Sequence, residues 1–162
     1  FSFDFRGAGR EIGRKLLEEG RKSIDFIFLN EVTAVLLDGI RSICSEAGRE
    51  LKVTTFQWDT PDVFAKIAAR YQDRVPDAIY VHGEHYDTLR DILDRSGIDT
   101  RNRCRLIAES HAIHSEYHGL RLHIPFEETG FEIGNRIAQH FHTSGITPEH
   151  RIIPLSVFSE GV

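Results

Sequence analysis

The chain has 162 residues, of which 40% are hydrophobic and 28% charged, and its formal net charge is −5. A chain of this length and composition can bury a hydrophobic core without disulfides or metals, which excludes a disordered or disulfide-dependent protein. Its hydrophobic runs are too short to span a bilayer, and its excess of acidic over basic residues argues against direct DNA binding.

Short hydrophobic segments predict four β-strands in the first two thirds of the chain. They are rich in β-branched or aromatic residues, are bounded by polar residues, Gly or Pro, and begin 27, 27 and 26 residues apart. The four segments are residues 24–29, 51–56, 78–81 and 104–108.

Hydrophobic residues before and between these strands follow the spacing of helix faces. Two helices are expected at about 8–19 and 84–95, and two more are predicted by hydrophobic stripes that run from Leu36 to Ala47 and from Phe64 to Tyr71. The helix with the stripe Phe64–Tyr71 is expected to have Thr60 as its N-cap and Pro61 as its first residue. Alternation of strand and helix at this interval predicts an α/β fold, a doubly wound and mostly parallel sheet with helices on both faces.

The last forty residues have a different pattern. Leu120, Leu122 and Ile124 alternate as a strand that ends at Pro125, and a long amphipathic helix follows. Residues 152–157 predict one more strand, which the internal Pro154 places at a sheet edge.

Functional residues of open parallel sheets lie beyond the carboxyl ends of the strands. This rule selects His82, Gly83 and Glu84 after the third strand, and Ser110 and His111 after the fourth. The rule also selects Trp58, whose ring could stack on a ligand, although a lid or interface contact is the simpler interpretation.

The nine histidines allow an alternative, a metal site. Such a site would combine His111 and His114 with His82 or His85 and with Glu84 or Glu109. The spacing matches no zinc signature, so polar loop histidines at the mouth of a cleft are the favoured interpretation. Glu109, Ser110 and His111 supply the residue types of a catalytic triad, but no G-x-S-x-G motif is present. We therefore expect neither catalysis nor a cofactor.

The two cysteines, Cys44 and Cys104, fall on hydrophobic faces of expected elements. They are expected to be buried free thiols, as in proteins of a reducing compartment.

Several segments, in order along residues 3–160, resemble the sensor domain of lactose-repressor-type (LacI/GalR) transcription regulators. The segments are Gly7–Arg10 with the following helix and strand, Gly39, Pro76–Val81, Ile124–Gly130 and Arg151–Leu155. Ile124–Gly130 is similar to the family's Q-P-F-E-E-L-G motif. The resemblance implies the fold of periplasmic binding proteins and a role in sensing a small molecule in the cytoplasm.

The resemblance also implies an organisation and an assembly. Residues 1–123 would form the second lobe of the sensor, and residues 124–162 would cross back to a first lobe that precedes residue 1. DNA would be bound only through a domain that this chain does not contain, and no membrane is involved. A homodimer is expected to form through the helix at about 84–95, with His85, Tyr86 and Leu89 in its interface.

Departures from the family pattern fall at its ligand-binding positions. Leu36 replaces an Arg, Gly83–Glu84 replace an Asn-Asp pair, and residues 108–111 replace G-F-D-D. A plain hexose is therefore a weaker expectation than a sugar-derived, anionic or otherwise atypical small molecule. Two rival functions use the same residues, namely a solute-binding protein of a transporter and a small His-rich metal-dependent enzyme.

Overall fold

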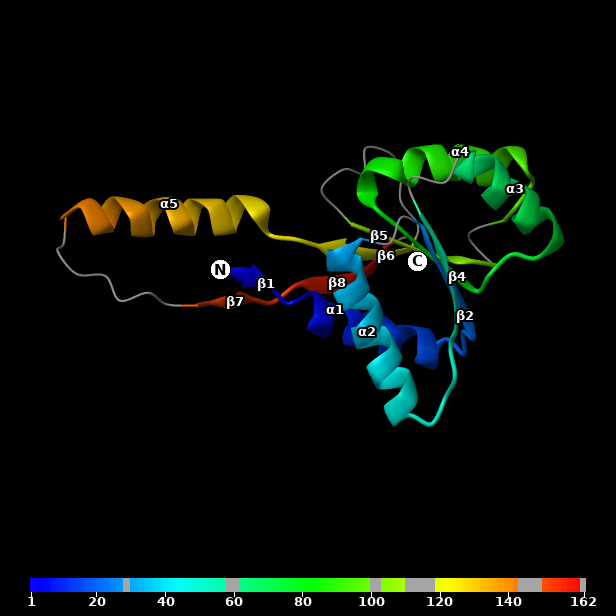
Figure 1. The fold of residues 1–162 in the computed structure, drawn as a ribbon, viewed down its shortest axis with the longest axis horizontal. Coiled ribbons are helices and arrows are strands. Elements are labelled where there is room, and N and C mark those ends of the chain that lie inside the picture. Colours follow the sequence, from blue (N-terminus) through cyan, green and yellow to red (C-terminus); the bar gives the residue numbers. More distant parts are fainter. Residues whose placement is uncertain (28–29, 58–61, 100–102, 110–118, 143–149, 161–162) are drawn as a thin grey trace.

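The computed structural model describes residues 1–27, 30–57, 62–99, 103–109, 119–142 and 150–160 (Figure 1). In chain order the elements are β1 (Ser2–Phe3), α1 (Phe5–Glu18), β2 (Ser23–Ile27), α2 (Glu31–Glu46), β3 (Lys52–Phe56), α3 (Val63–Asp73), β4 (Ala78–Val81), the 3-10 turn η1 (Gly83–His85), α4 (Tyr86–Arg95), β5 (Arg105–Glu109), β6 (Gly119–His123), α5 (Phe126–His142), β7 (Ile152–Ile153) and β8 (Ser156–Glu160).

Six strands form the central sheet, in the order β3-β2-β4-β5-β6-β8. The first five pair in parallel, and β8 pairs antiparallel with β6 at one edge. The parallel sheet predicted from the regular spacing of hydrophobic segments is confirmed. Since the strands alternate with helices, the carboxyl ends of β2, β3, β4 and β5 share one edge of this sheet.

Helices cover both faces of the sheet, as predicted, and each face has its own core (Figure 1). Ile12 of α1 and Ile40 of α2 pack with Phe26 on one face. Ile67 of α3 and Leu89 of α4 pack with Ile79 on the other. The central strand β4 is buried along its whole length, which explains its continuous hydrophobic sequence.

Helices α1 and α2 approach each other closely because glycines face each other at their contact. A Cβ atom at Gly9 would lie 2.0 Å from the Leu36 carbonyl oxygen, and one at Gly39 would lie 2.2 Å from the Arg6 carbonyl oxygen. Only glycine fits at these two positions, so the position of α2 depends on them.

Several boundaries differ from the prediction. Helix α1 begins at Phe5 rather than near residue 8. Helix α3 begins at Val63, not at Pro61, and the preceding Asp62 has a left-handed φ of 55°. The expected strand 152–157 is two strands, because Pro154 lacks the N–H that would continue the ladder. Its second part, β8, is an edge strand as predicted.

The elements α5, β1 and β7 form an arm that projects from the main lobe (Figure 1). β1 and β7 pair in parallel as a separate two-stranded sheet. Helix α5 packs on this sheet through Phe126, whose ring centroid lies 5.3 Å from that of Phe3. The Arg136 guanidinium lies 5.3 Å from the Phe1 ring centroid.

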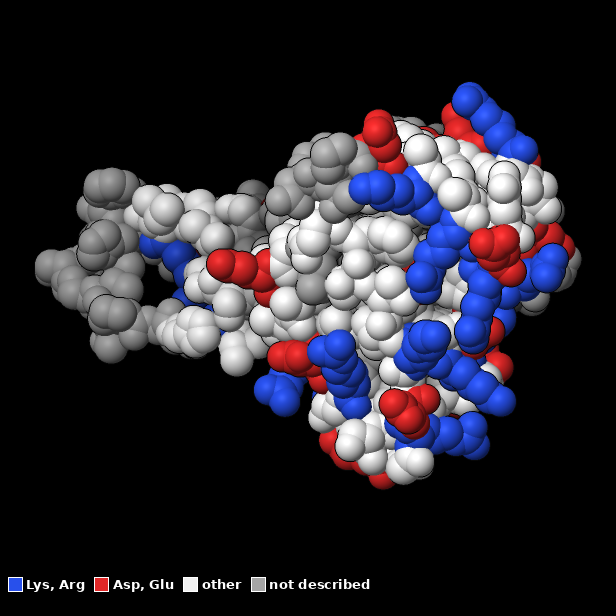
Figure 2. Space-filling model, turned by 45° about the vertical axis from the view of Figure 1, so that its right-hand side comes forward, with Lys and Arg blue, Asp and Glu red and all other residues white. Residues whose placement is uncertain are grey.

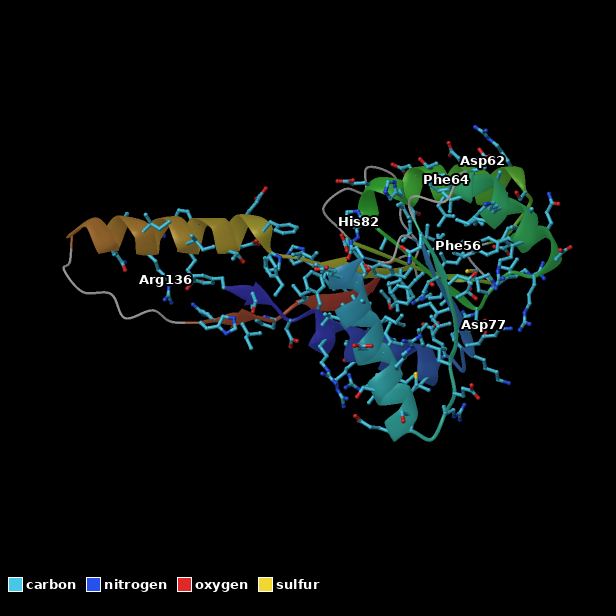
Figure 3. All side chains as sticks on the ribbon, viewed as in Figure 1. Phe56, Asp62, Phe64, Asp77, His82 and Arg136 are labelled. Atoms are coloured by element: carbon cyan, nitrogen blue, oxygen red, sulfur yellow. The ribbon has the colours of Figure 1, made fainter. Side chains whose placement is uncertain are left out.

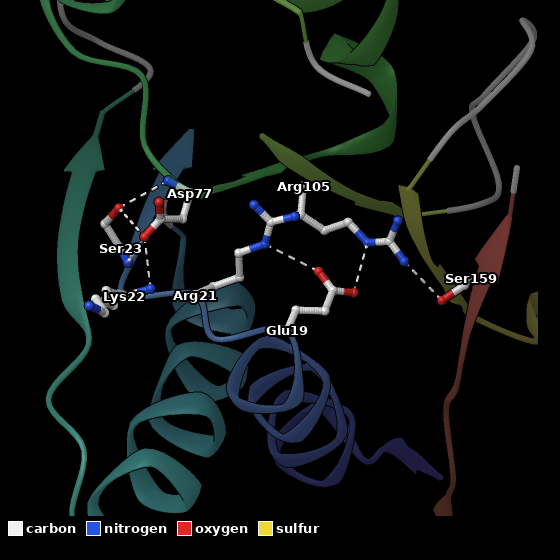
Figure 4. A network of polar contacts seen from close by, with 7 residues as sticks. All are labelled: Glu19, Arg21, Lys22, Ser23, Asp77, Arg105 and Ser159. Atoms are coloured by element: carbon white, nitrogen blue, oxygen red, sulfur yellow. Dashed lines mark hydrogen bonds and ion pairs between the residues drawn. The ribbon is translucent and has the colours of Figure 1, made fainter. Parts of the chain in front are cut away.

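The amino edge of the main sheet is held by a polar network (Figure 4). The Asp77 carboxylate accepts hydrogen bonds from the backbone N–H groups of Lys22 and Ser23 and from the Ser23 hydroxyl. Arg105 pairs with Glu19 and donates to the Ser159 hydroxyl. The network fixes the amino ends of the strands and joins the edge strand β8 to β5.

Both cysteines are buried and free, in agreement with the sequence prediction. Burial raises the pKa of the Cys104 thiol to about 12, so this side chain stays protonated and packs as a small hydrophobic group. In the part of the chain that the structure describes, no helix combines the length and hydrophobicity needed to cross a membrane.

Candidate functional site

The candidate site lies at the carboxyl edge of the sheet, where polar side chains follow the buried strands. Asn30 precedes α2, Gln57 follows β3, His82 follows β4, and Glu109 is the last residue of β5. Parallel pairing of β4 with β5 aligns Val81 with Ala108, which brings His82 and Glu109 side by side.

A buried carboxylate forms the centre of this edge. The Tyr80 hydroxyl donates to Glu109 Oε1 at 2.7 Å, and His82 Nε2 lies 3.1 Å from Glu109 Oε2. The Glu109 side chain is only 4% exposed, whereas that of His82 is 27% exposed. Both carboxylate oxygens therefore have partners, which offsets the cost of burying the charge, and the imidazole of His82 links the carboxylate to the surface.

Three rings continue this edge towards α3. The ring centroids of His82 and His85 are 6.2 Å apart, and those of His85 and Phe64 are 6.5 Å apart. Figure 3 shows Phe64 and His82 at the same end of the lobe. Burial and the neighbouring His82 lower the pKa of His85, so His85 is uncharged at neutral pH and offers an aromatic face.

The structure places three of the predicted ligand residues at this edge. His82 is partly exposed, Gly83 is a buried residue of η1, and Glu84 is exposed beside it. Trp58, Ser110 and His111 lie outside the described residues.

Leu36 was expected at the ligand site, and this prediction is wrong for its side chain. Leu36 has 0% exposed surface, and its side chain packs in the core that α1 and α2 form on the sheet. No ligand can contact a side chain that is enclosed in this way.

The expected dimer residues Tyr86 and Leu89 are also corrected. Their side chains are buried in the core that α3 and α4 form on the sheet, so they cannot supply surface for a second subunit. His85 is partly exposed. The outward face of α4 is polar and carries the exposed residues Thr88, Asp91 and Asp94.

Sequence reasoning did not assign Tyr80 and Phe64 to the site. It placed Glu109 there only as part of the segment 109–111 after the fourth strand, and otherwise considered it for a metal or a triad. Glu109 ends a buried strand, and a charged residue at the carboxyl end of such a strand indicates a functional site. Tyr80 lies within an apparently hydrophobic strand, and only its hydroxyl distinguishes it from a core residue.

The described residues contain no group of three His, Cys, Asp or Glu side chains arranged to hold a metal ion. The expected partners His111 and His114 are not among these residues.

No protein-family model matches the sequence, and no curated protein matches it. Solved structures do match. A LacI family transcriptional regulator from Enterococcus faecium with bound ribose has a TM-score of 0.78 at 15% identity over 97% of this chain and 62% of the other.

Two further structures agree with this result. A periplasmic binding protein/LacI transcriptional regulator from Alkaliphilus metalliredigens, complexed with D-xylulofuranose, has a TM-score of 0.75 at 18% identity over 98% of this chain and 63% of the other. A LacI family regulator from Rhizobium etli has a TM-score of 0.74 at 20% identity over 95% and 61% of the two chains. The present chain therefore has the fold of these ligand-binding domains and spans about three fifths of their length.

Proposed function

We propose that this chain is the ligand-sensing and dimerising part of a LacI-type transcription regulator. It binds a small molecule at the carboxyl edge of the sheet, beside His82 and Glu109, and acts by binding rather than by catalysis. The ligand controls DNA binding by a domain that this chain does not contain, because it favours one arrangement of the lobes over another.

The observation that carries this proposal is the Tyr80–Glu109–His82 contact at the carboxyl edge. A buried carboxylate with two partners holds a half-exposed imidazole in one orientation, and such fixed polar groups are what a specific ligand site needs. The likeness in fold to regulators that hold ribose and D-xylulofuranose supports a small-molecule ligand.

The exposed hydrophobic surface of the arm supports the division into lobes. Phe131 on α5 is 74% exposed and Ile152 on β7 is 61% exposed. Phe1, Phe126 and Ile137 of the arm are exposed as well, and large hydrophobic side chains concentrated on one part of the surface mark a place where other polypeptide packs. We propose that α1 to β6, together with β8, form one lobe, and that β1, α5 and β7 belong to a second lobe, whose remainder covers the arm.

Dimerisation belongs to the same proposal, with a corrected interface. The outward face of α4 would pair with its copy through Thr88 and through ion pairs between Asp91 of one copy and Arg95 of the other. A solute-binding protein of a transporter is a second candidate, because one similar structure is described as a periplasmic binding protein/LacI transcriptional regulator. A helix-turn-helix or a secretion signal in the gene upstream of this segment distinguishes the two.

Amide NMR titration with D-ribose, D-xylulose and lactose tests the ligand site. We expect shifts at residues 80–85 and 109 with at least one sugar, and loss of these shifts in His82→Ala. His150→Ala is the matched control, because His150 lies on the arm and contacts Ser2. Shifts confined to the amino edge of the sheet, around Lys22 and Asp77, would contradict the proposed site.

A further inference from the structure

We propose that a second binding site, for an oxyanion that retains a proton, such as hydrogen phosphate, lies at the amino edge of the sheet. The site is a small hollow between β2, β3 and the end of α3, at the opposite edge from the candidate ligand site. Three features carry the inference: a buried carboxylate oxygen without a hydrogen-bond partner, the cations around the hollow, and the size of the hollow.

The side chain of Asp25 forms the floor of the hollow. Ile24 and Phe26 of β2 face the core under α1 and α2, so Asp25 between them faces the other side of the sheet, towards α3. It is 2% exposed, and its Oδ2 accepts no hydrogen bond from any residue that the structure describes. Arg70 Nε, 3.4 Å away, forms an ion pair with it but no hydrogen bond. A buried carboxylate oxygen is costly without a donor, so this oxygen indicates a ligand that donates a hydrogen bond.

A neighbouring hydroxyl does not supply that donor in the structure. The Tyr71 side chain lies beside Asp25, yet its buried hydroxyl is likewise without a hydrogen-bond partner among the described residues. A closer approach of the two groups would satisfy the carboxylate. It would leave the cations around the hollow unexplained, because Tyr71 is not among the residues that line it.

Three cations surround the hollow. Lys52 comes from the start of β3, and Arg70 and Arg74 come from the end of α3. In the described part of the chain, the side chains of Lys52 and Arg74 have no ion pair or hydrogen bond. Arg70 is held in place, since it donates to the Thr54 hydroxyl at 3.0 Å and lies 6.0 Å from the Phe56 ring centroid. A guanidinium fixed in this way loses little conformational entropy when it binds an anion.

Basic residues at the end of a helix often serve only to balance its dipole. The carboxyl end of α3 carries about half a negative charge, which Arg70 and Arg74 offset. This role explains neither Lys52, which belongs to β3, nor the unpaired oxygen of Asp25. The residues that line the hollow supply three positive charges against one negative charge, which leaves an excess over the charge of the helix end.

Acidic residues close by confine the attraction to the hollow itself. Asp73, Asp77 and Glu50 are near its lining residues in sequence, but none of them lines it. The Asp77 carboxylate accepts hydrogen bonds from Lys22 and Ser23 (Figure 4). Figure 2 shows Lys and Arg side chains gathered on the side of the lobe that is remote from the arm, with acidic side chains among them. An anion is therefore attracted here at short range, by the lining residues, and not by the field of the whole edge.

The size of the hollow and its charges select the ligand. Its volume of about 10 Å³ admits one oxygen atom and excludes a sugar or an aromatic ring. One hydroxyl group can therefore reach Asp25, while the rest of the ligand stays among the cations. An ammonium group could donate to the carboxylate, but three cations would repel it. An oxyanion that retains a proton suits both parts, because its hydroxyl donates to Asp25 and its other oxygens accept from the cations.

Sulfate provides the matched comparison, because it has the shape of phosphate but no proton at pH 7. The full chain is titrated with sodium phosphate and with sodium sulfate at equal ionic strength, and backbone amides and the Asp25 carboxyl carbon are followed by NMR. We expect phosphate to bind at least about threefold more tightly than sulfate, with shifts at residues 23–25, 52–54 and 70–74. Equal or tighter binding of sulfate would overturn the inference. No saturable shift at these residues with either anion would show that the hollow takes only solvent and would also overturn it.

The Asp25→Asn variant tests whether the carboxylate detects the proton of the ligand. An amide can donate an N–H to sulfate as readily as to phosphate, so we expect the preference for phosphate to be lost. Urea unfolding confirms that the variant is folded. A preference that survives in folded Asp25→Asn would contradict the assigned role of Asp25.

A second variant tests the cations. Lys52→Gln removes one positive charge beside the hollow and should weaken phosphate binding at least about twofold. Lys15→Gln makes the same change in net charge on α1, which covers the other face of the sheet, and should leave binding unchanged. An equal effect of both variants would show only the net charge of the protein and would contradict a local site.

Discussion

Asp25 is a charged side chain in the interior of the sheet. It lies in β2, is 2% exposed, and its Oδ2 is 3.4 Å from Arg70 Nε. Burial raises the pKa of this carboxyl group, and the nearby Arg70 offsets only part of the effect. A carboxyl group with a raised folded pKa favours the folded state when it is protonated. Its ionisation therefore costs stability, and the cost grows as the pH rises above the pKa of the unfolded chain.

The Asp25→Asn variant is accordingly expected to be more stable than the wild type at pH 7, by about 1 kcal/mol, and nearly equal to it at pH 3. Urea unfolding at the two pH values measures this difference. Asp73→Asn, an exposed change at the end of α3, is the control and should have no effect at either pH. A lower stability of Asp25→Asn at pH 7 would show that the pairing with Arg70 outweighs the cost of burial.

Asp77 stabilises the amino edge through three hydrogen bonds to Lys22 and Ser23. The Asp77→Ala variant leaves two backbone N–H groups without this acceptor and is expected to lose about 2 kcal/mol of unfolding free energy. Because the amino and carboxyl edges lie at opposite ends of the strands, its ligand shifts at residues 80–85 should match those of the wild type. Thermal unfolding and NMR titration check the two statements, and altered ligand shifts would indicate coupling between the edges.

Individual site residues were predictable where the backbone alone determines their position. His82 and Glu84 follow β4, so the rule for parallel sheets places them at the carboxyl edge. Leu36 was misplaced because the resemblance to the family put it at a ligand position, and Tyr86 and Leu89 because hydrophobic residues near a helix start were taken as interface surface, although helical spacing already put all three on a buried face. Each belongs to the hydrophobic stripe of its helix, and that stripe packs on the sheet.

At the level of elements, the close contact of α1 with α2 makes Gly39 hard to replace. In Gly39→Ala the added methyl group would meet the Arg6 carbonyl oxygen, and the helices would have to separate. We expect a loss of about 2–3 kcal/mol of unfolding free energy, measured by urea denaturation.

The matched control is Gly134→Ala on the exposed side of α5, where no atom lies within 4 Å of the added Cβ. Alanine is the better helix former, so this variant should be as stable as the wild type or slightly more stable. A similar loss in both variants would mean that helix propensity, rather than the contact between the helices, explains the result.

Most elements could be predicted from the sequence because their hydrophobic periods are regular. The errors fall where a single residue ends or divides an element that the hydrophobic pattern would continue. Thr60 and Pro61 form a helix-start signal, but Asp62 takes a left-handed conformation before α3 begins. Pro154 suggested an edge strand, but sequence alone does not show that the segment divides between two sheets. Partner strands distant in sequence decide that outcome.

At the level of the whole molecule, the polar outward face of α4 determines what kind of dimer is expected. Pairing of the exposed Asp91 of one copy with the exposed Arg95 of the other would be electrostatic, so the dimer should weaken as salt is raised. Asp91→Arg would place like charges opposite each other and should raise the dimer dissociation constant measured by sedimentation by about tenfold, whereas Asp73→Arg on α3 should not change it. A monomer at micromolar concentration, in a protein that contains both lobes, would contradict dimerisation.

Three short connections join the arm to the main lobe, and this has a mechanical consequence. The chain passes between them at Asp4, at Ile124–Pro125 and at Pro154–Leu155. A single linker would let two bodies reorient freely, but three tethers that each continue directly into a strand or helix do not. Two of the crossings contain proline, whose ring fixes one of the backbone torsions that would otherwise turn. The arm and the lobe are thus restricted from reorienting independently. A small displacement of one is transmitted to the other.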